Sequence, residues 1–207
     1  MDSSRDLGLF PLDLVLLPGE RIPLHLFEAR YRQLYADCVL DDHPFVVVRT
    51  TEAGPEPIGC AARFDELIQR LDDGRLNVVV LGVEPVEILE ETEGNLYFSA
   101  TVRSLIDDET VAPDPVIAAD VVTRFRALAE KVTGTPRDPE VDDGVPLSYA
   151  VAGAVEIPPD TKQQILASRD ENQRLLLVAR ALEVAAGSIE RASVAAERAS
   201  TNGKVSH

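Results

Sequence analysis

The chain has 207 residues, of which 45% are hydrophobic and 27% are charged, a globular balance that supplies enough apolar surface for one large or two small domains. Its formal net charge of −16 argues against nucleic acid and against an anionic membrane surface as partners, because both would be repelled at long range. The amino terminus shows no apolar signal region and no apolar run approaches the ~18 residues of a membrane span, so we expect a cytoplasmic protein.

Residues 9–41 are predicted to form a strand, a proline-bracketed turn, a short second strand and a helix. Alternating apolar residues over 10–16 indicate a strand that is largely buried on both faces, and Pro18-Gly19 ends it. The alternation resumes over residues 22–26. The apolar face of the helix that follows is predicted to consist of Phe27, Tyr31, Leu34 and Cys38, at spacings of 4, 3 and 4.

The next segment reads as a series of strands joined by short turns. Strands are predicted over residues 45–48, 58–71, 76–81 and 96–105, with broken alternation over 83–89. Asp73-Gly74 is a strong hairpin signal, and Gly82 indicates a bulge or a barrel corner. Because no helix intervenes, this pattern predicts a closed antiparallel barrel.

A change of composition at Asp107 marks the expected domain boundary. Residues 107–115 form a linker, and Asp114-Pro115 then starts a helix whose apolar face is Ile117, Val121, Phe125, Leu128 and Val132. Further helices are predicted over 146–155 and 160–167, and from Asp170 onward. We therefore predict a barrel subdomain over 1–106, a helical bundle over 107–192 and a flexible tail over 193–207.

Several stretches, taken in order, resemble one known family. They are LFPL followed by VLLPGERIPLHLFEARYR within residues 9–32, then Ile58–Arg63, Asp73-Gly74-Arg75, Phe98–Val102, Leu147-Ser148-Tyr149 and Lys162-Gln163. The pattern looks like the amino-terminal, substrate-binding domain of Lon proteases, and it is most similar to small stand-alone bacterial proteins built from that domain alone. The resemblance implies an α+β fold, in which a six-stranded, PUA-like antiparallel β-barrel with an inserted helix is followed by a C-terminal helical bundle.

The resemblance also implies recognition of unfolded or tagged polypeptides, in the role of an adaptor or a regulator of a protease. The catalytic parts of a Lon protease are not found in the sequence: there is no GxxxxGK[ST] phosphate loop, no Ser-Lys dyad and no GxSxG motif. We therefore expect a non-catalytic module without a cofactor or a metal. Its expected partners are a polypeptide or a protease, and its expected state is a monomer or a weak homodimer.

The candidate binding residues cluster at the start of the first helix and are His25, Phe27, Glu28, Arg30, Tyr31 and Arg32. The favoured interpretation of the charged members is a clamp between that helix and the barrel. The alternative is a polar rim around a peptide groove in which Phe27 and Tyr31 are the apolar anchors. The cleft between barrel and bundle is the expected place for such a groove.

His25 and the two cysteines allow more than one interpretation. We expect His25 to be buried and hydrogen-bonded, with a ligand contact as the alternative; a metal site formed with Cys38 and an acidic residue lacks the paired spacing of structural zinc. Cys38 and Cys60 are expected to be reduced and buried. Two rival functions remain open: a small-molecule binder or enzyme that uses His25 and Glu28 in the same cleft, and a structural homodimeric partner protein.

Overall fold

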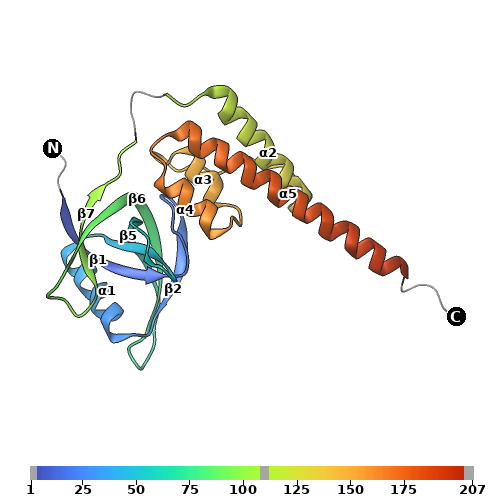
Figure 1. The fold of residues 1–207 in the computed structure, drawn as a ribbon. Coiled ribbons are helices and arrows are strands. Elements are labelled where there is room, and N and C mark those ends of the chain that lie inside the picture. Colours follow the sequence, from blue (N-terminus) through green and yellow to red (C-terminus); the bar gives the residue numbers. More distant parts are fainter. Residues whose placement is uncertain (1–3, 108–111, 203–207) are drawn as a thin grey trace.

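A computed structural model of the chain describes residues 4–107 and 112–202, with side chains described as far as residue 192. The strands and one helix come first in the chain, and we call this segment the β part (5–104) (Figure 1). The remaining four helices follow, and we call them the helical part (115–202). The elements of the β part are β1 (Arg5–Leu12), β2 (Arg21–Leu26), α1 (Ala29–Asp41), β3 (Phe45–Thr51), β4 (Gly54–Pro55), β5 (Ile58–Arg70), β6 (Leu76–Thr92) and β7 (Ser99–Ser104). Those of the helical part are α2 (Pro115–Thr133), α3 (Leu147–Gly153), α4 (Pro159–Ala167) and α5 (Glu171–Asn202).

The described strands form one seven-stranded sheet in the order β1-β7-β6-β5-β3-β4, with β2 paired to β6. All of these pairs are antiparallel except the pair between β1 and β3, through which the pairings return to β1. The prediction of a wholly antiparallel arrangement is therefore wrong at this pair, because the crossover through β2 and α1 brings the chain back in the direction of β1. The strand beyond the predicted six is β4, two residues that lie between the strands predicted over 45–48 and 58–71.

The long hairpin of β5 and β6 follows the prediction, including its turn at Gly74, where φ is +83°. The register shifts between Ala61 and Ala62, opposite Glu84 and Gly82, which confirms the bulge expected at Gly82. A Cβ at Gly82 would lie 2.1 Å from the carbonyl oxygen of Leu17, so glycine lets the turn before β2 pack directly on β6.

Apolar side chains are buried on both faces of the sheet. One cluster lies on one face of the sheet, and its members are Leu7, Leu9, Val46, Val48, Ala61, Val86, Ala100 and Val102. A larger cluster begins on the other face, with Phe10, Phe45 and Cys60, and continues into the helical part. The expected burial of β1 on both faces is thus confirmed over residues 7–10, although the strand ends at Leu12 and not at Leu16.

The inserted helix α1 buries three of its four predicted apolar residues, Tyr31, Leu34 and Cys38. Phe27 is the exception, because the helix begins at Ala29 and Phe27 lies before its first turn with 61% of its surface exposed. Cys38 and Cys60 are both free and buried, as predicted.

In the helical part, α5 packs against α2, α3 and α4 and extends well beyond them (Figure 1). Asp114 caps α2 by accepting a hydrogen bond from the backbone of Val116, with Pro115 at the first helical position, as predicted. The last helix continues to Asn202, which is farther than the residue 192 at which the sequence predicted a tail. Residues 108–111 of the predicted linker and residues 203–207 lie outside the described part of the chain.

Candidate functional site

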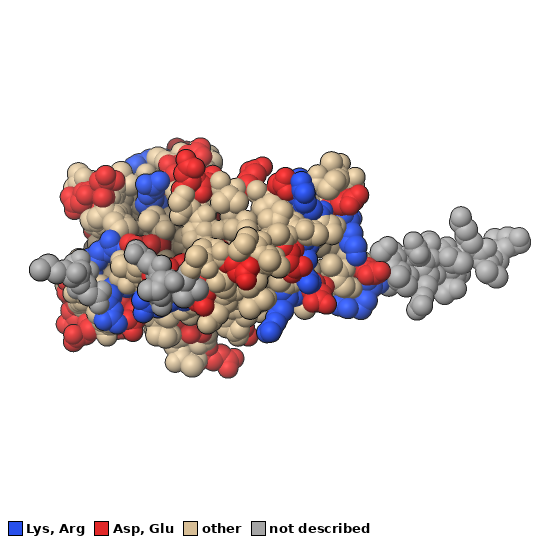
Figure 2. Space-filling model, turned by 90° about the horizontal axis from the view of Figure 1, so that it is seen from above, with Lys and Arg blue, Asp and Glu red and all other residues tan. Residues whose placement is uncertain are grey.

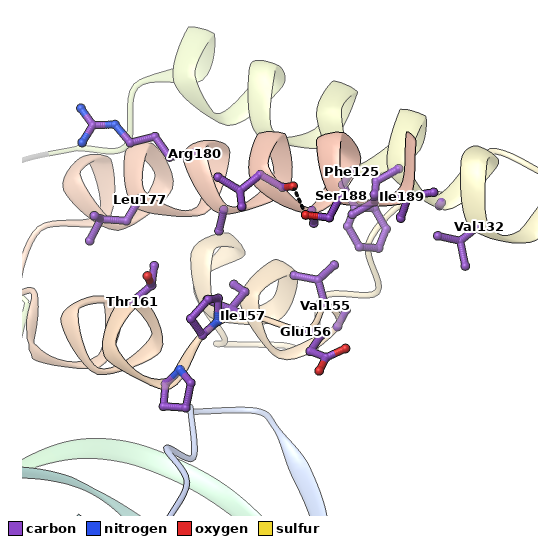
Figure 3. A pocket seen from close by; sticks show the side chains of 18 of the residues that line it. Phe125, Val132, Val155, Glu156, Ile157, Thr161, Leu177, Arg180, Ser188 and Ile189 are labelled. Atoms are coloured by element: carbon purple, nitrogen blue, oxygen red, sulfur yellow. Dashed lines mark hydrogen bonds between the residues drawn. The ribbon is translucent and has the colours of Figure 1, made fainter. Parts of the chain in front are cut away.

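A hollow lies within the helical part, between α2, α5 and the segment that joins α3 to α4 (Figure 3). Its volume is about 870 Å³. We call it the α2–α5 groove. Most of its lining is apolar, and the apolar residues include Phe125, Leu128, Val132, Val155, Ile157, Leu177, Val184 and Ile189.

The groove forms because α2 and α5 bury only part of their apolar faces against each other. Phe125 and Leu128 on α2 and Leu182 on α5 are buried, so this part of the contact is closed. Val132 and Val184 are 64% and 62% exposed, although both belong to the groove. The prediction that Val132 is buried is therefore wrong. Val132 continues the apolar face of α2 beyond the part of the helix that other elements cover.

The opposite wall comes from the connection between α3 and α4. The two prolines at positions 158 and 159 separate these helices, because a residue before proline is disfavoured in the helical conformation. Ile157 points from this connection into the space beneath α5, and only 8% of its surface is exposed (Figure 3). An apolar floor thus faces an apolar helical wall, which is a surface suited to apolar side chains of a partner.

The polar residues of the groove are hydroxyls and a few charged groups. The hydroxyls of Thr133 and Ser188 donate to carbonyl oxygens of their own helices, at 2.8 Å to Ala129 and 3.0 Å to Val184. The charged residues of the lining are Arg137, Glu156 and Arg180. None of the described lining residues is a histidine or a cysteine.

The predicted residues His25 and Phe27 lie on the surface of the β part. His25 is exposed, and its Nδ1 lies 2.6 Å from Oδ1 of Asn77, so its expected hydrogen bond is present while its expected burial is wrong. The alternation of β2 explains this, since Leu24 and Leu26 point to the covered face and His25 points away. The ring of Phe27 lies 6.0 Å from that of His25.

The remaining predicted residues separate into surface and core. Arg30 donates to Glu28 at 2.8 Å, and its guanidinium lies over the rings of Tyr31 and Phe98 at 4.6 and 5.3 Å. Arg32 donates to the carbonyl oxygen of Asp73 at 3.3 Å, which links α1 to the β5–β6 turn as the clamp interpretation expected.

Tyr31 is 6% exposed and stacks on Phe10 with ring centroids 4.1 Å apart. Its burial raises the pKa of its phenol above the ordinary value. It offers almost no exposed surface to a peptide, so the structure does not bring Phe27 and Tyr31 together as a pair of anchors.

The junction of the two parts, where a cleft was expected, is largely occupied by polar contacts of α4. Lys162 pairs with Glu20 at 2.6 Å, and both side chains are nearly buried. Gln163 donates to the carbonyl oxygen of Ile58 at 2.9 Å, and Arg49 pairs with Asp160 at 2.7 Å. The hollow beside this junction measures about 270 Å³, so the expected cleft is much smaller than the α2–α5 groove.

Among the described residues, no group of three or more His, Cys, Asp and Glu side chains is arranged to hold a metal ion. No helix in the described part of the chain combines the length and the apolar character that crossing a membrane requires.

Comparisons with known proteins agree with one another. The family model described as "ATP-dependent protease La (LON) substrate-binding domain" matches residues 6–184. Two curated relatives are Lon proteases, from Anaeromyxobacter dehalogenans (25% identical over 83% of this chain) and from Paraburkholderia phytofirmans (26% over 85%). The chain spans only 22% and 23% of the length of these relatives.

Two solved structures share the fold. One is a Lon N-terminal domain protein from Xanthomonas campestris, with a TM-score of 0.62 and 23% identity, covering 83% of this chain and 95% of that one. The other is the N-terminal domain of Lon protease from the Mycobacterium avium complex, with a TM-score of 0.68 and 17% identity, covering 86% and 98%.

Proposed function

This chain belongs to the family of ATP-dependent protease La (LON) substrate-binding domains, and from that membership we propose that it is a non-catalytic module that recognises polypeptides. The proposal includes a role as an adaptor or a regulator of a protease. Because the chain spans less than a quarter of the length of its curated relatives, the proteolytic activity that their name states is not carried over to it.

The α2–α5 groove is the proposed binding site, and its uncovered apolar wall is the observation that carries this assignment. Val132 and Val184 are more than half exposed although they border a hollow of about 870 Å³. Apolar surface of this kind, gathered in a concavity, is typical of sites that receive apolar groups. The proposed occupant is an unfolded segment whose apolar side chains enter the groove, since folded proteins keep most such side chains inside.

Several further expectations belong to the same proposal. They are a closed, PUA-like barrel over residues 1–106, a separate helical subdomain over 107–192, a cytoplasmic location and a monomeric or weakly dimeric state. The candidate residues His25, Phe27, Glu28, Arg30 and Arg32 remain a second surface to be tested, on the β part and apart from the groove.

The test compares two double variants by fluorescence anisotropy, with a labelled, permanently unfolded polypeptide as the probe. Val132→Gln/Val184→Gln replaces the two exposed apolar residues of the groove with a good helix former. We expect the dissociation constant to rise at least about tenfold, because each valine contributes roughly 1.5 kcal/mol when it is fully covered.

The matched control is Val116→Gln/Leu176→Gln, which again changes one exposed apolar residue on α2 and one on α5, at 75% and 48% exposure, outside the groove. We expect the control to bind like the parent protein. Circular dichroism and thermal unfolding must show that both variants are folded. Equal binding by the two double variants would remove the groove as the site, and Phe27→Ala would then be tested for the β part.

A further inference from the structure

We propose that the α2–α5 groove selects apolar segments that carry acidic residues on both sides, because arginines without partners border it. This inference rests on the proposed function and names the class of polypeptide that the groove takes. It follows from how the chain distributes its cations and from the length of the groove.

Most described cationic side chains already have a partner. Those with no hydrogen bond, ion pair or aromatic contact among the described residues are Arg63, Arg70, Arg137 and Arg180. Arg137 and Arg180 both line the α2–α5 groove, whereas Arg63 and Arg70 are exposed on β5. In a chain with 36 acidic and 20 basic residues, a free arginine is uncommon, so two at one groove indicate a place for external carboxylates.

The carboxylates near the groove do not neutralise these arginines. On α2, Asp120 pairs with Arg124 at 2.7 Å, and on α5, Glu190 lies 3.7 Å from Lys131. The acidic residue of the lining is Glu156, which stands on the α3–α4 connection, away from Arg180 and toward the end of the groove where Val132 lies (Figure 3).

A third cation strengthens the positive side of the groove. Arg191 donates to the hydroxyl of Ser188 at 2.9 Å, and Ser188 itself lines the groove. Figure 2 shows Lys and Arg side chains, interspersed with Asp and Glu side chains, toward the right-hand end of the molecule. The charged residues that line the groove are thus two arginines and one glutamate, whereas the chain as a whole carries a net charge of −16.

The positions of the arginines fix where the acidic residues of a bound segment belong. Arg180 lies toward the end of the groove marked by Leu177, and Val132 lies at the other end (Figure 3). Arg137 follows Val132 by five residues, after α2 has ended at Thr133, and we therefore assign it to the end where Val132 lies. From Arg180 to Ile189, α5 covers about 14 Å at roughly 1.5 Å per residue. An extended segment of about four residues covers the same length at roughly 3.4 Å each. Acidic residues on both sides of four apolar ones would thus meet the two ends, which a single terminal carboxylate would not.

The net charge of −16 makes this preference a sharp test. If the long-range field of the protein decided selectivity, basic segments would bind best. If the groove decides it, acidic flanks bind best, because contacts within a few ångströms are screened less than the distant charges.

The experiment uses three labelled peptides, each with the same four central apolar residues, acetylated and amidated at its ends. Two residues on each side are Asp, Ser or Lys. Anisotropy titrations with the whole chain are expected to give a dissociation constant about fivefold lower for the Asp-flanked than for the Ser-flanked peptide, since each exposed ion pair contributes a factor of roughly two to five. The Lys-flanked peptide is expected to bind most weakly.

Two double variants with the same change of net charge assign the effect. Arg137→Gln/Arg180→Gln is expected to bring the Asp-flanked peptide to the affinity of the Ser-flanked one and to leave the latter unchanged. Arg63→Gln/Arg70→Gln is expected to keep the full preference.

The charge rule is overturned, with groove binding intact, if the Lys-flanked peptide binds as tightly as the Asp-flanked one, or if the preference survives in Arg137→Gln/Arg180→Gln. Absence of binding by all three peptides would instead remove the proposed function at this groove, and the inference with it.

Discussion

The β part and the helical part differ in where their exposed apolar side chains lie. In the β part the large exposed apolar side chains do not line the α2–α5 groove; they are Phe27 before α1, Val39 and Leu40 near the end of α1, Leu67 and Ile68 on β5, Val83 and Leu89 on β6, and Leu96 and Phe98 between β6 and β7. In the helical part Val132 and Val184 belong to the walls of one hollow. Exposed apolar residues scattered singly are ordinary, whereas those that share a concavity indicate a partner.

The two parts are nevertheless joined firmly. One buried cluster runs from Phe10 and Phe45 in the β part to Phe125 and Leu182 in the helical part, and the nearly buried pair of Glu20 and Lys162 lies at the junction. We therefore attribute the open groove to the helices themselves and not to loose packing between the parts.

The first prediction, which has the largest expected effect, compares the reactivity of buried thiols in the β part with that of a thiol placed in the groove. Burial, with the charges of Asp37 and Asp41, raises the pKa of the Cys38 thiol to about 12, and burial also raises the pKa of Cys60. At pH 8 the thiolate fraction of Cys38 is then roughly a thousandfold below that of a free cysteine, whose pKa is about 8.5. Alkylation followed by mass spectrometry should find both thiols unmodified in the folded protein and modified after unfolding.

A cysteine placed in the groove is the matched control. Val184→Cys stands where the present side chain is 62% exposed, so it should react at the rate of a free thiol. Fast modification of Cys38 or Cys60 in the folded chain would mean that the β part opens, and the contrast between a closed and an open part would fail.

Apolar residues that repeat every two positions, or every three to four, were enough to predict most strands and helices, because this spacing reflects which face of a single element is buried. The β5–β6 hairpin at Gly74 and the helix start at Asp114-Pro115 are examples, and both rest on local chemistry. The groove was not predictable in this way. Its walls come from α2, α5 and the connection at Pro158, and only their mutual positions leave Val132 uncovered.

The candidate site at α1 shows the same limit. The spacing of Phe27 and Tyr31 fits one helical face, but the helix begins two residues after Phe27, so one ring is exposed and the other is in the core. The parallel pairing of β1 with β3 was also beyond reach, because it depends on the path of the chain through β2 and α1.

The second prediction concerns the buried contacts of Arg174 in the helical part. The side chain of Arg174 is fully buried, stands 4.5 Å from the ring centroid of Tyr149 and donates to Asp107 at 2.6 and 2.5 Å and to Glu171 at 2.8 Å. Arg174→Ala removes the cationic partner of the nearly buried carboxylate of Glu171, which keeps only its hydrogen bonds from Ser148, and we expect the free energy of unfolding in urea to fall by about 3–5 kcal/mol. Arg180→Ala, an exposed change on the same helix, should stay within about 0.5 kcal/mol of the parent. A similar loss of unfolding free energy in both variants would show that the effect comes from any change on α5 and not from the contacts of Arg174.

The third prediction separates the core of the β part from its surface and at the same time tests the alternative binding site. Tyr31→Ala removes a buried ring that stacks on Phe10, so we expect a loss of about 3 kcal/mol in the free energy of unfolding. Phe27→Ala removes an exposed ring and should change it by less than about 0.5 kcal/mol.

The affinity for an unfolded polypeptide decides what the exposed ring does. If the α2–α5 groove is the site, Phe27→Ala binds like the parent, because Phe27 stands on the β part and is not among the residues that line the groove. A tenfold weaker affinity in this variant, with its stability unchanged, would transfer the site to the surface formed by His25, Phe27 and Arg30. Exposed apolar residues of the β part would then carry the function, and the groove would be only a consequence of how α2 and α5 pack.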